Sequence, residues 1–300
     1  MIRLPPLLLL LPACGAETLA QSWQLDRLRV LAVAAEPAEP RPGDTVSFTS
    51  LVYTPTGVSL AGTVWFACLP QSADEFGCTL DPALLDALQV DPSALSPDEL
   101  AELVALAQEA GLIGFEPGFA PRWPVPADAL DALPEAARAE GLSAIINVTA
   151  LPESASGATL DPAEVEAAYK RVPVSLAATP NHNPAVDGVD IEPAVAPQDG
   201  LHAVQPGATY TLTPRFPDSA IEEYVFINED GAEESRTEEP YFTWYAEGGT
   251  FDQPFSLYPT SDVEWTAPDA GFEGWVLVVM RDRRGGMAWS GLRLSTGEAR

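Results

Sequence analysis

The sequence is poor in basic residues, and lysine is almost absent. It has 15 Lys and Arg against 44 Asp and Glu, so the formal net charge is −29, and the one lysine is Lys170. Because proteins bind phosphate backbones through clustered Lys and Arg, this balance argues against a nucleic-acid partner. We interpret the scarcity of lysine as compositional bias rather than as a sign of chemistry.

Histidine and the usual catalytic motifs are also scarce. The two histidines, His182 and His202, lie in segments rich in Pro and Gly, where a solvated loop position is expected. The sequence contains no G-x-S-x-G nucleophile motif, no H-E-x-x-H zinc motif and no glycine-rich phosphate loop. We therefore predict no catalytic residue, no metal site and no cofactor. A hydrolase with its site in the helical segment described below is kept as an alternative.

A long apolar run occurs only at the N-terminus, and no later segment is long enough to span a bilayer. Residues 1–13 have a basic start and a leucine-rich run that ends in small residues, which is typical of a signal peptide. The run ends in Leu-Pro-Ala-Cys, which resembles the lipobox of bacterial lipoproteins. The resemblance implies that Cys14 carries lipid, palmitate included, and that this N-terminal lipid holds the protein in the membrane through a tether at residues 14–22. Gly15, rather than Asp, follows this cysteine, and this resembles lipoproteins that are sorted to the outer membrane rather than the inner membrane. The alternative is an ordinary signal peptide in which Cys14 is incidental.

Only two cysteines remain once Cys14 is set aside. An exported protein meets an oxidising compartment, so Cys68 and Cys78 are predicted to form a disulfide bond. Closing so short a loop would stabilise the fold by about 2–3 kcal/mol. The rival interpretation, a metal site, lacks any other Cys or His nearby.

Proline and glycine are frequent and indicate many short strands joined by turns, with 30 Pro and 22 Gly. One turn and strand occur twice, because RPGDTVSFTSLV at 41–52 aligns without gaps on QPGATYTLTPRF at 205–216. Alternation along a strand puts every second residue on one face. The predicted buried faces are Val46, Phe48 and Val52 in the first copy and Tyr210, Leu212 and Phe216 in the second. This repeat near the start of each half of the chain predicts that the same type of domain occurs twice.

Helical patterns interrupt the first half of the chain. Ser96-Pro97-Asp98-Glu99 predicts a capping box that opens a helix with Leu100, Leu103, Val104 and Ala107 on one face. Shorter helices are expected within Ala127 to Glu140 and from Asp161 to about Lys170. Because strand character returns at Leu142, we expect a helical insertion at about residues 81–141.

The clearest motif lies at residues 242–295. It reads W-Y-A-E-G-G-T-F from Trp244, V-E-W-T-A-P from Val263 and G-W-V-L-V-V-M-R-D from Gly274, with Gly285-Gly286 after it. The pattern resembles the second half of bacterial immunoglobulin-like domains of surface proteins, which carry W-x-A-x-G-G, a later W-x-A-P and a strand ending in Asp before a glycine-rich hairpin. The resemblance implies a β-sandwich and no particular activity.

These patterns predict a mainly β protein of two immunoglobulin-like β-sandwich domains. The first spans residues 23–178 and carries the helical insertion at about 81–141. Residues 179–188 form a linker, and the second domain spans residues 189–295.

Two features of the C-terminal half have alternative interpretations. Trp244, Trp265 and Trp289 could form a platform for sugar stacking, but their strand setting favours core packing. Leu292 and Leu294 continue the alternation of Met287 and Trp289 only after a one-residue slip at Gly291, which predicts a β-bulge.

The acidic stretch from Asp218 to Glu239 could ligate calcium through carboxylates and carbonyls. It lacks the spacing of an EF-hand loop, and Asp230-Gly231 is a good hairpin turn. We therefore expect a hairpin here rather than a metal site.

The sequence favours a non-enzymatic, lipid-anchored envelope protein that binds a protein or glycan partner. The alternative, from a different class, is a structural accessory lipoprotein that presents its helical insertion to an envelope assembly.

Overall fold

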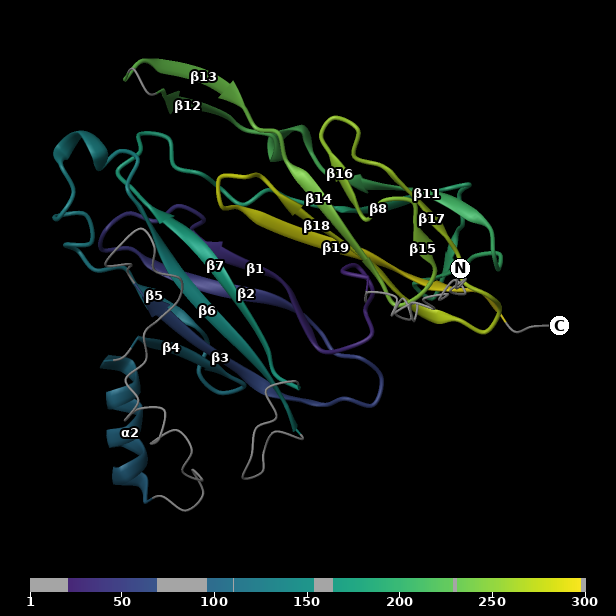
Figure 1. The fold of residues 1–300 in the computed structure, drawn as a ribbon, viewed down its shortest axis with the longest axis horizontal. Helices are drawn as coiled ribbons and strands as arrows, with labels where there is room; N and C mark the ends of the chain where they lie inside the picture. The colour runs from purple at the N-terminus through teal and green to yellow at the C-terminus, as the bar shows by residue number, and fades with distance from the viewer. Residues whose placement is uncertain (1–20, 69–95, 110, 154–163, 229–230, 298–300) are drawn as a thin grey trace, which may run out of the picture.

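The computed structural model describes residues 21–68, 96–109, 111–153, 164–228 and 231–297. Over these residues the protein is mainly β, and its strands form two sandwiches that lie side by side (Figure 1). Cys14, Cys78 and the signal peptide lie outside the described residues, so what the sequence predicts for them remains a prediction. Among the described residues no helix is long and apolar enough to cross a bilayer.

The N-terminal sandwich has a three-stranded and a four-stranded sheet, both antiparallel. The first sheet has the order β1 (Arg29–Glu36), β2 (Thr45–Tyr53), β5 (Arg122–Pro124). The second has the order β4 (Leu112–Glu116), β3 (Leu60–Cys68), β6 (Leu142–Pro152), β7 (Glu166–Val174). A core lies between the sheets, where Phe48 stacks on Trp65 at a ring-centroid distance of 5.8 Å.

The C-terminal sandwich has a four-stranded and a six-stranded sheet. The first has the order β15 (Thr250–Phe251), β17 (Val263–Thr266), β11 (Thr209–Arg215), β8 (Gly188–Glu192). The second has the order β16 (Phe255–Leu257), β14 (Tyr241–Ala246), β18 (Glu273–Arg281), β19 (Met287–Ser295), β10 (Leu201–Ala203), β9 (Pro197–Gln198). Between β11 and β14, β12 (Glu223–Ile227) and β13 (Glu233–Thr237) form a separate hairpin, preceded by a 3-10 turn at Asp218–Ala220.

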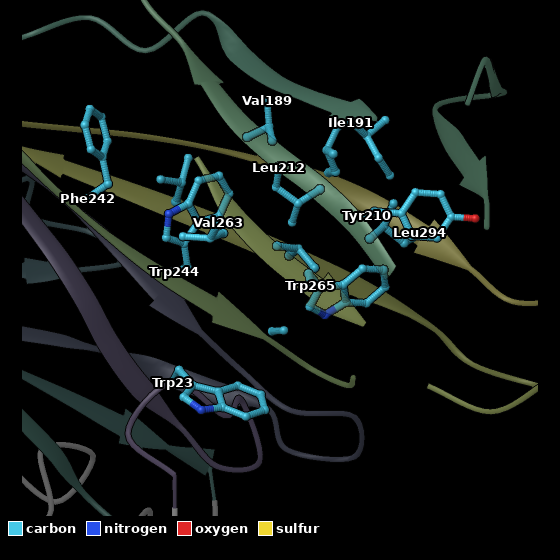
Figure 2. Close-up of a cluster of buried hydrophobic side chains, with 14 of the residues drawn as sticks. Trp23, Val189, Ile191, Tyr210, Leu212, Phe242, Trp244, Val263, Trp265 and Leu294 are labelled. Carbon is cyan, nitrogen blue, oxygen red and sulfur yellow. The ribbon is translucent and has the colours of Figure 1, made fainter. Parts of the chain in front are cut away.

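The strand order of the C-terminal sandwich is of the immunoglobulin type. In that fold one sheet has the order A-B-E-D and the other contains C-F-G. Here β8, β11, β17 and β15 take the first set of positions, and β14, β18 and β19 take the second. One difference is that the chain after β14 contributes β15 to one sheet and then β16 to the other. Figure 2 shows the core between the sheets, with Trp244 and Trp265 fully buried in it as expected.

The repeated turn and strand occupy equivalent places in the two sandwiches. Gly43 and Gly207 both have positive φ, at 90° and 68°, as a glycine at such a turn permits. The strands that follow are β2, which lies between β1 and β5, and β11, which lies between β8 and β17. The alternation is confirmed at its centre, since Val46, Phe48, Tyr210 and Leu212 are buried.

The helical insertion expected at about residues 81–141 is not confirmed over its described part, where most residues are not helical. One α-helix, α2 (Pro97–Glu109), occurs there, and its capping box is confirmed because Ser96 N–H donates to Glu99 Oε2 at 2.8 Å. Strands β4 and β5 follow it and belong to the two sheets. The segment from Ala127 to Glu140 forms turns and a short 3-10 helix at Glu135–Ala137, because Pro134 interrupts it.

The helix expected from Asp161 to about Lys170 is also wrong in its described part. Residues from Glu166 onward belong to β7, which pairs antiparallel with β6 from Ala150↔Glu166 to Leu142↔Val174. Pairing along a whole strand outweighs the local helix propensity of Glu, Ala and Lys.

The two sandwiches meet through a third apolar cluster. It contains Leu31 and Tyr53 from the N-terminal sandwich and Tyr245 and Val279 from the C-terminal one, with Trp289 packed against it. Arg281 strengthens the contact by donating from its guanidinium to Leu31 O at 2.9 Å. Residues 181–187, expected as part of a linker, run without regular structure and pack into this junction, where Asn183 Nδ2 donates to Ala35 O at 2.7 Å.

This junction explains the pattern of β19. The pairing of β18 with β19 is continuous through Leu277↔Gly291, so the predicted β-bulge at Gly291 is wrong. Met287 and Trp289 face the N-terminal sandwich, whereas Leu292 and Leu294 face the core of their own sandwich. The apolar pattern changes face because the strand is covered on different sides at its two ends.

Candidate binding site

The β12–β13 hairpin projects from the C-terminal sandwich as an arm (Figure 1). We define the hairpin arm as residues 222–238. Its two ends meet, because Glu238 N–H donates to Glu222 O at 2.9 Å. The predicted hairpin is confirmed. The chain leaves the sandwich after β11, forms the arm and returns to β14, and β12 and β13 pair only with each other rather than with either sheet of the sandwich.

The hairpin arm is acidic and carries exposed apolar side chains. It holds seven acidic residues and one arginine, a net charge of −6. On β12 the side chains of Val225 and Phe226 are 53% and 37% exposed. Arg236 of β13 lies 3.6 Å above the Phe226 ring and is held by Glu234 at 2.7 Å. The edge strand β16 adds Phe255 and Leu257, 53% and 47% exposed.

At the base of the arm, Arg284 organises a cluster of carboxylates. Its guanidinium donates to Glu238 Oε1 at 3.0 Å and to Glu222 Oε2 at 3.2 Å, and lies 3.8 Å from Glu39 of the N-terminal sandwich. It also lies 4.4 Å above the ring of Tyr224. Burial raises the pKa of Glu238 above its ordinary value, although its hydrogen bonds and the Arg284 charge oppose the shift. Arg284 thus fixes the arm to both sandwiches.

Asp282 fixes the turn that carries Arg284. It is 2% exposed and accepts hydrogen bonds from the N–H groups of Arg284, Gly285 and Gly286 at 2.7–2.9 Å. Asn181 Nδ2 donates to its other oxygen at 2.8 Å. The turn holds Arg283 at a φ of 72°, which non-glycine residues rarely adopt. The backbone geometry here is therefore determined by one buried carboxylate.

Lys170 joins the N-terminal sandwich to the same turn. It is 3% exposed, and its Nζ donates to Gly285 O. Burial lowers the pKa of Lys170 to about 8; Asp282 opposes this shift and Arg281 adds to it. The one lysine of the chain is thus a contact between the two sandwiches.

A pocket of about 600 Å³ opens beside this cluster. We call it the arm-base pocket. Its walls come from the arm and the residues after it, from the turn after β16, and from the β18–β19 turn. The residues that line it are Tyr224, Arg236, Thr237, Glu238, Glu239, Tyr258, Pro259, Asp282, Arg283 and Arg284.

The residues predicted from sequence to be functional lie elsewhere. Cys68 ends β3, while Cys78 is not among the described residues, so their pairing remains a prediction. Trp289 lies at the junction between the sandwiches. His182 lies 2.9 Å from Glu222 at the edge of the charged cluster and is 71% exposed in its side chain, whereas His202 contacts Val195 O. No group of three or more His, Cys, Asp or Glu suited to a metal ion occurs among the described residues.

The sequence analysis missed Lys170, Asp282 and Arg284. The run Asp282-Arg-Arg-Gly-Gly appeared there only as a strand end and a glycine-rich hairpin. A carboxylate followed at once by four turn residues is a pattern that Asp commonly stabilises through backbone N–H groups, and it could have indicated the turn. The contact with Lys170 spans 115 positions and left no signal in the sequence.

Comparison with known proteins finds only weak structural similarities. No family model matches the chain, and no curated protein matches it in sequence. Among solved structures it is similar to the fibronectin(III)-like modules of Clostridium thermocellum CbhA, with 10% identity, a TM-score of 0.23, and coverage of 89% of this chain and 95% of that one. It is also similar to the two tandem V-type regions of VCBP3, a v-region-containing chitin binding protein, with 13% identity, a TM-score of 0.27, and coverage of 89% and 99%. Since both TM-scores are below 0.5, we base the immunoglobulin-type assignment on strand order alone.

Proposed function

We propose that this protein is a non-enzymatic, lipid-anchored binding protein of a bacterial cell envelope. In this proposal Cys14 carries the lipid, the outer membrane is the site of anchoring, and Cys68 pairs with Cys78 in the exported protein. Two immunoglobulin-like domains, with boundaries near residues 23–178 and 189–295, then hold a partner-binding surface away from the membrane. The partner is a protein or a glycan.

The observation that carries the proposal is the hairpin arm. An isolated two-stranded hairpin is at best marginally stable in water, so the sandwich gains little from it. Exposed Phe226 is of the aromatic type that is enriched in interface centres, Val225 adds exposed apolar surface, and the surrounding carboxylates suit the polar rim of an interface. Arg284 fixes the direction of the arm relative to both sandwiches. Such an arm is suited to contact a partner.

The binding proposal is tested by site-specific photocrosslinking in native envelopes. A photoreactive residue at Val225 should give a discrete adduct. The same residue at Val58, a 38% exposed valine in a turn of the N-terminal sandwich, should give none. Equal adducts from both positions, or none from Val225, would count against the arm as the binding surface.

The anchor is tested separately. Cys14→Ser should abolish lipid labelling and release the protein into the soluble fraction, and unchanged membrane association would contradict the proposed location. Thiol titration of the unfolded, unreduced protein should find neither Cys68 nor Cys78 free.

A second candidate function is favoured by one observation on α2. Val104 and Leu106 are 39% and 46% exposed on this helix, although Ala107 is buried. These two positions are about 200° apart around the helix, so each side chain is exposed singly, and a partner in an envelope assembly would contact one of them. Photocrosslinking from Leu106, with no adduct from Val225, would favour this accessory role.

A further inference from the structure

The arm-base pocket has the size of a small-ligand site, and its lining is largely charged with two tyrosines. Its volume of about 600 Å³ falls within the range of roughly 300–1,000 Å³ that is usual for such pockets. Its walls combine two tyrosine rings with hydrogen-bonding side chains from three separate segments of the chain. The charges and the hydrogen-bonding groups of this lining indicate which ligand it would select.

The charges that line the pocket cancel. Three arginines, at 236, 283 and 284, face three carboxylates, at 238, 239 and 282. Each guanidinium is already within 4.0 Å of a carboxylate: Arg236 of Glu234, Arg283 of Glu239 and Arg284 of Glu238. An anionic ligand would have to displace a carboxylate and enter a molecule of net charge −29. A cation would have to displace an arginine. The lining therefore favours a neutral ligand.

The same lining offers many donors and acceptors close together. Arg283 and Glu239 at the mouth are 48% and 75% exposed in their side chains and lie 3.8 Å apart, so both keep hydrogen-bonding capacity for a ligand. Tyr258 is 39% exposed and presents an aromatic ring to the pocket. A ligand that matches this lining has apolar faces for an aromatic ring and adjacent hydroxyl groups for paired donors and acceptors.

We propose that the arm-base pocket binds a neutral oligosaccharide, with one sugar ring on Tyr258 and its hydroxyl groups on Arg283 and Glu239. This inference rests on the proposed function, because the pocket belongs to the same surface as the hairpin arm. Arg283 is held at positive φ by the Asp282 turn, and this fixes where its side chain leaves the backbone. Trp244 and Trp265, for which a sugar-stacking platform was only the alternative interpretation, lie in the core, and in this proposal Tyr258 is the stacking residue.

Binding is tested by isothermal titration and saturation-transfer NMR with neutral cello-, malto- and chito-oligosaccharides. An oligogalacturonate is the acidic comparison. At least one neutral series should bind, with a Kd of ~1 mM or tighter, and the oligogalacturonate more weakly. Tyr258→Ala should weaken binding at least about ten-fold. Phe119→Ala, which removes a 40% exposed ring from the N-terminal sandwich, should leave binding unchanged.

Arg283→Gly gives a sharper variant. Glycine accepts the positive φ of this position without strain, so the fold should be kept or slightly stabilised while the guanidinium is lost. Weakened binding in a protein of unchanged or higher Tm would support the proposal.

Three results would overturn the saccharide site: no neutral binding up to ~10 mM, preference for the oligogalacturonate, or wild-type affinity in both variants. If the Val225 photocrosslink persists in that case, the proposed function stands and the saccharide site alone is wrong. If the photocrosslink is also absent, both fail.

Discussion

Lys170 occupies a strand position where apolar residues would be expected. Its inward-facing neighbours along β7 are Ala168, Val172 and Val174, all in contact with the core. A buried ammonium is costly unless it has partners, and here Gly285 O accepts a hydrogen bond while Asp282 supplies charge. Lys170 therefore contributes to the contact between the two sandwiches as well as to the packing of β7.

The ionisation of Lys170 can be measured directly because the chain has no other lysine. In protein labelled with ¹⁵N only at lysine, the side-chain amine should titrate with a midpoint near pH 8, below the ordinary value of 10.5. The cause is burial at the junction. A midpoint at or above 10 would mean that Lys170 is solvated.

The same shift predicts how stability depends on pH. Between pH 8 and 10.5 the unfolded state retains the lysine proton that the folded state has lost, so the stability of the folded state rises through this window. The difference between the two pKa values corresponds to at most roughly 3 kcal/mol. Relative to Lys170→Met, the wild type should gain this amount in urea unfolding from pH 8 to 10.5. A flat difference between the two proteins would contradict the assignment.

At the scale of elements, the hairpin arm should be dispensable for folding. Its ends already meet through the Glu222–Glu238 backbone hydrogen bond, so an Asn-Gly turn can replace residues 223–237. We expect the excised protein to keep its far-ultraviolet circular dichroism and to lose only a few degrees of Tm. An excess of the excised protein should not compete with the photocrosslink from Val225 of the full-length protein, whereas an excess of the wild type should. Loss of folding would show that the arm is structural.

The capping box of α2 gives a second test at this scale. Ser96 Oγ lies 2.6 Å from Glu99 Oε2, and the same contacts lower the pKa of Glu99. Ser96→Ala should speed hydrogen exchange of the α2 amides about five-fold, because a cap that satisfies the first N–H groups is lost. The overall Tm should change little. Ser143→Ala, an exposed serine in a strand, should leave exchange in α2 unchanged.

The sequence predicted best the elements whose partners lie on one side only. Trp265 alternates with the polar residues Glu264 and Thr266 in β17, and it lies in the core of a single sandwich. The first part of β7 was missed because its residues favour a helix locally, and only the hydrogen bonds to β6 make it a strand. β4 and β5 are too short to show a period of two.

The candidate site was the part least visible in the sequence. Glu39 approaches Arg284 only when the two sandwiches pack, and nothing in the local sequence of either residue indicates that contact. The hairpin was visible through Asp230-Gly231, yet its exposed apolar side chains look like those of any half-buried strand. The contact of the arm base with the N-terminal sandwich depends on how the two sandwiches pack, so it becomes visible only in the structure.

For the whole molecule, the junction makes the two sandwiches one unit. Apolar residues of both form one cluster, and polar contacts lie beside it: Tyr53 Oη donates to Glu247 at 2.7 Å, and Asn181 N–H, in the segment between the sandwiches, donates to Glu39 at 2.7 Å. The hydrogen bond to Glu247 and burial both raise the pKa of Tyr53, and burial is the larger cause. The arm, fixed by Arg284 to both sandwiches, thus has a set direction relative to the N-terminal sandwich.

We therefore predict that the wild-type protein unfolds in a single transition, and that one substitution at the junction makes the two sandwiches unfold separately. Val279 is fully buried, but it faces the junction rather than the core of its own sandwich. In Val279→Asp the buried carboxylate would cost several kcal/mol, and separation of the sandwiches would return it to water without unfolding either. Differential scanning calorimetry should show two transitions in this variant and one in the wild type, with a larger radius of gyration by small-angle scattering. Trp275→Asp, on the same face of β18 but 43% exposed, should keep one transition. If Val279→Asp also kept one transition at an unchanged Tm, the joint unfolding of the two sandwiches would not depend on the apolar contact at the junction.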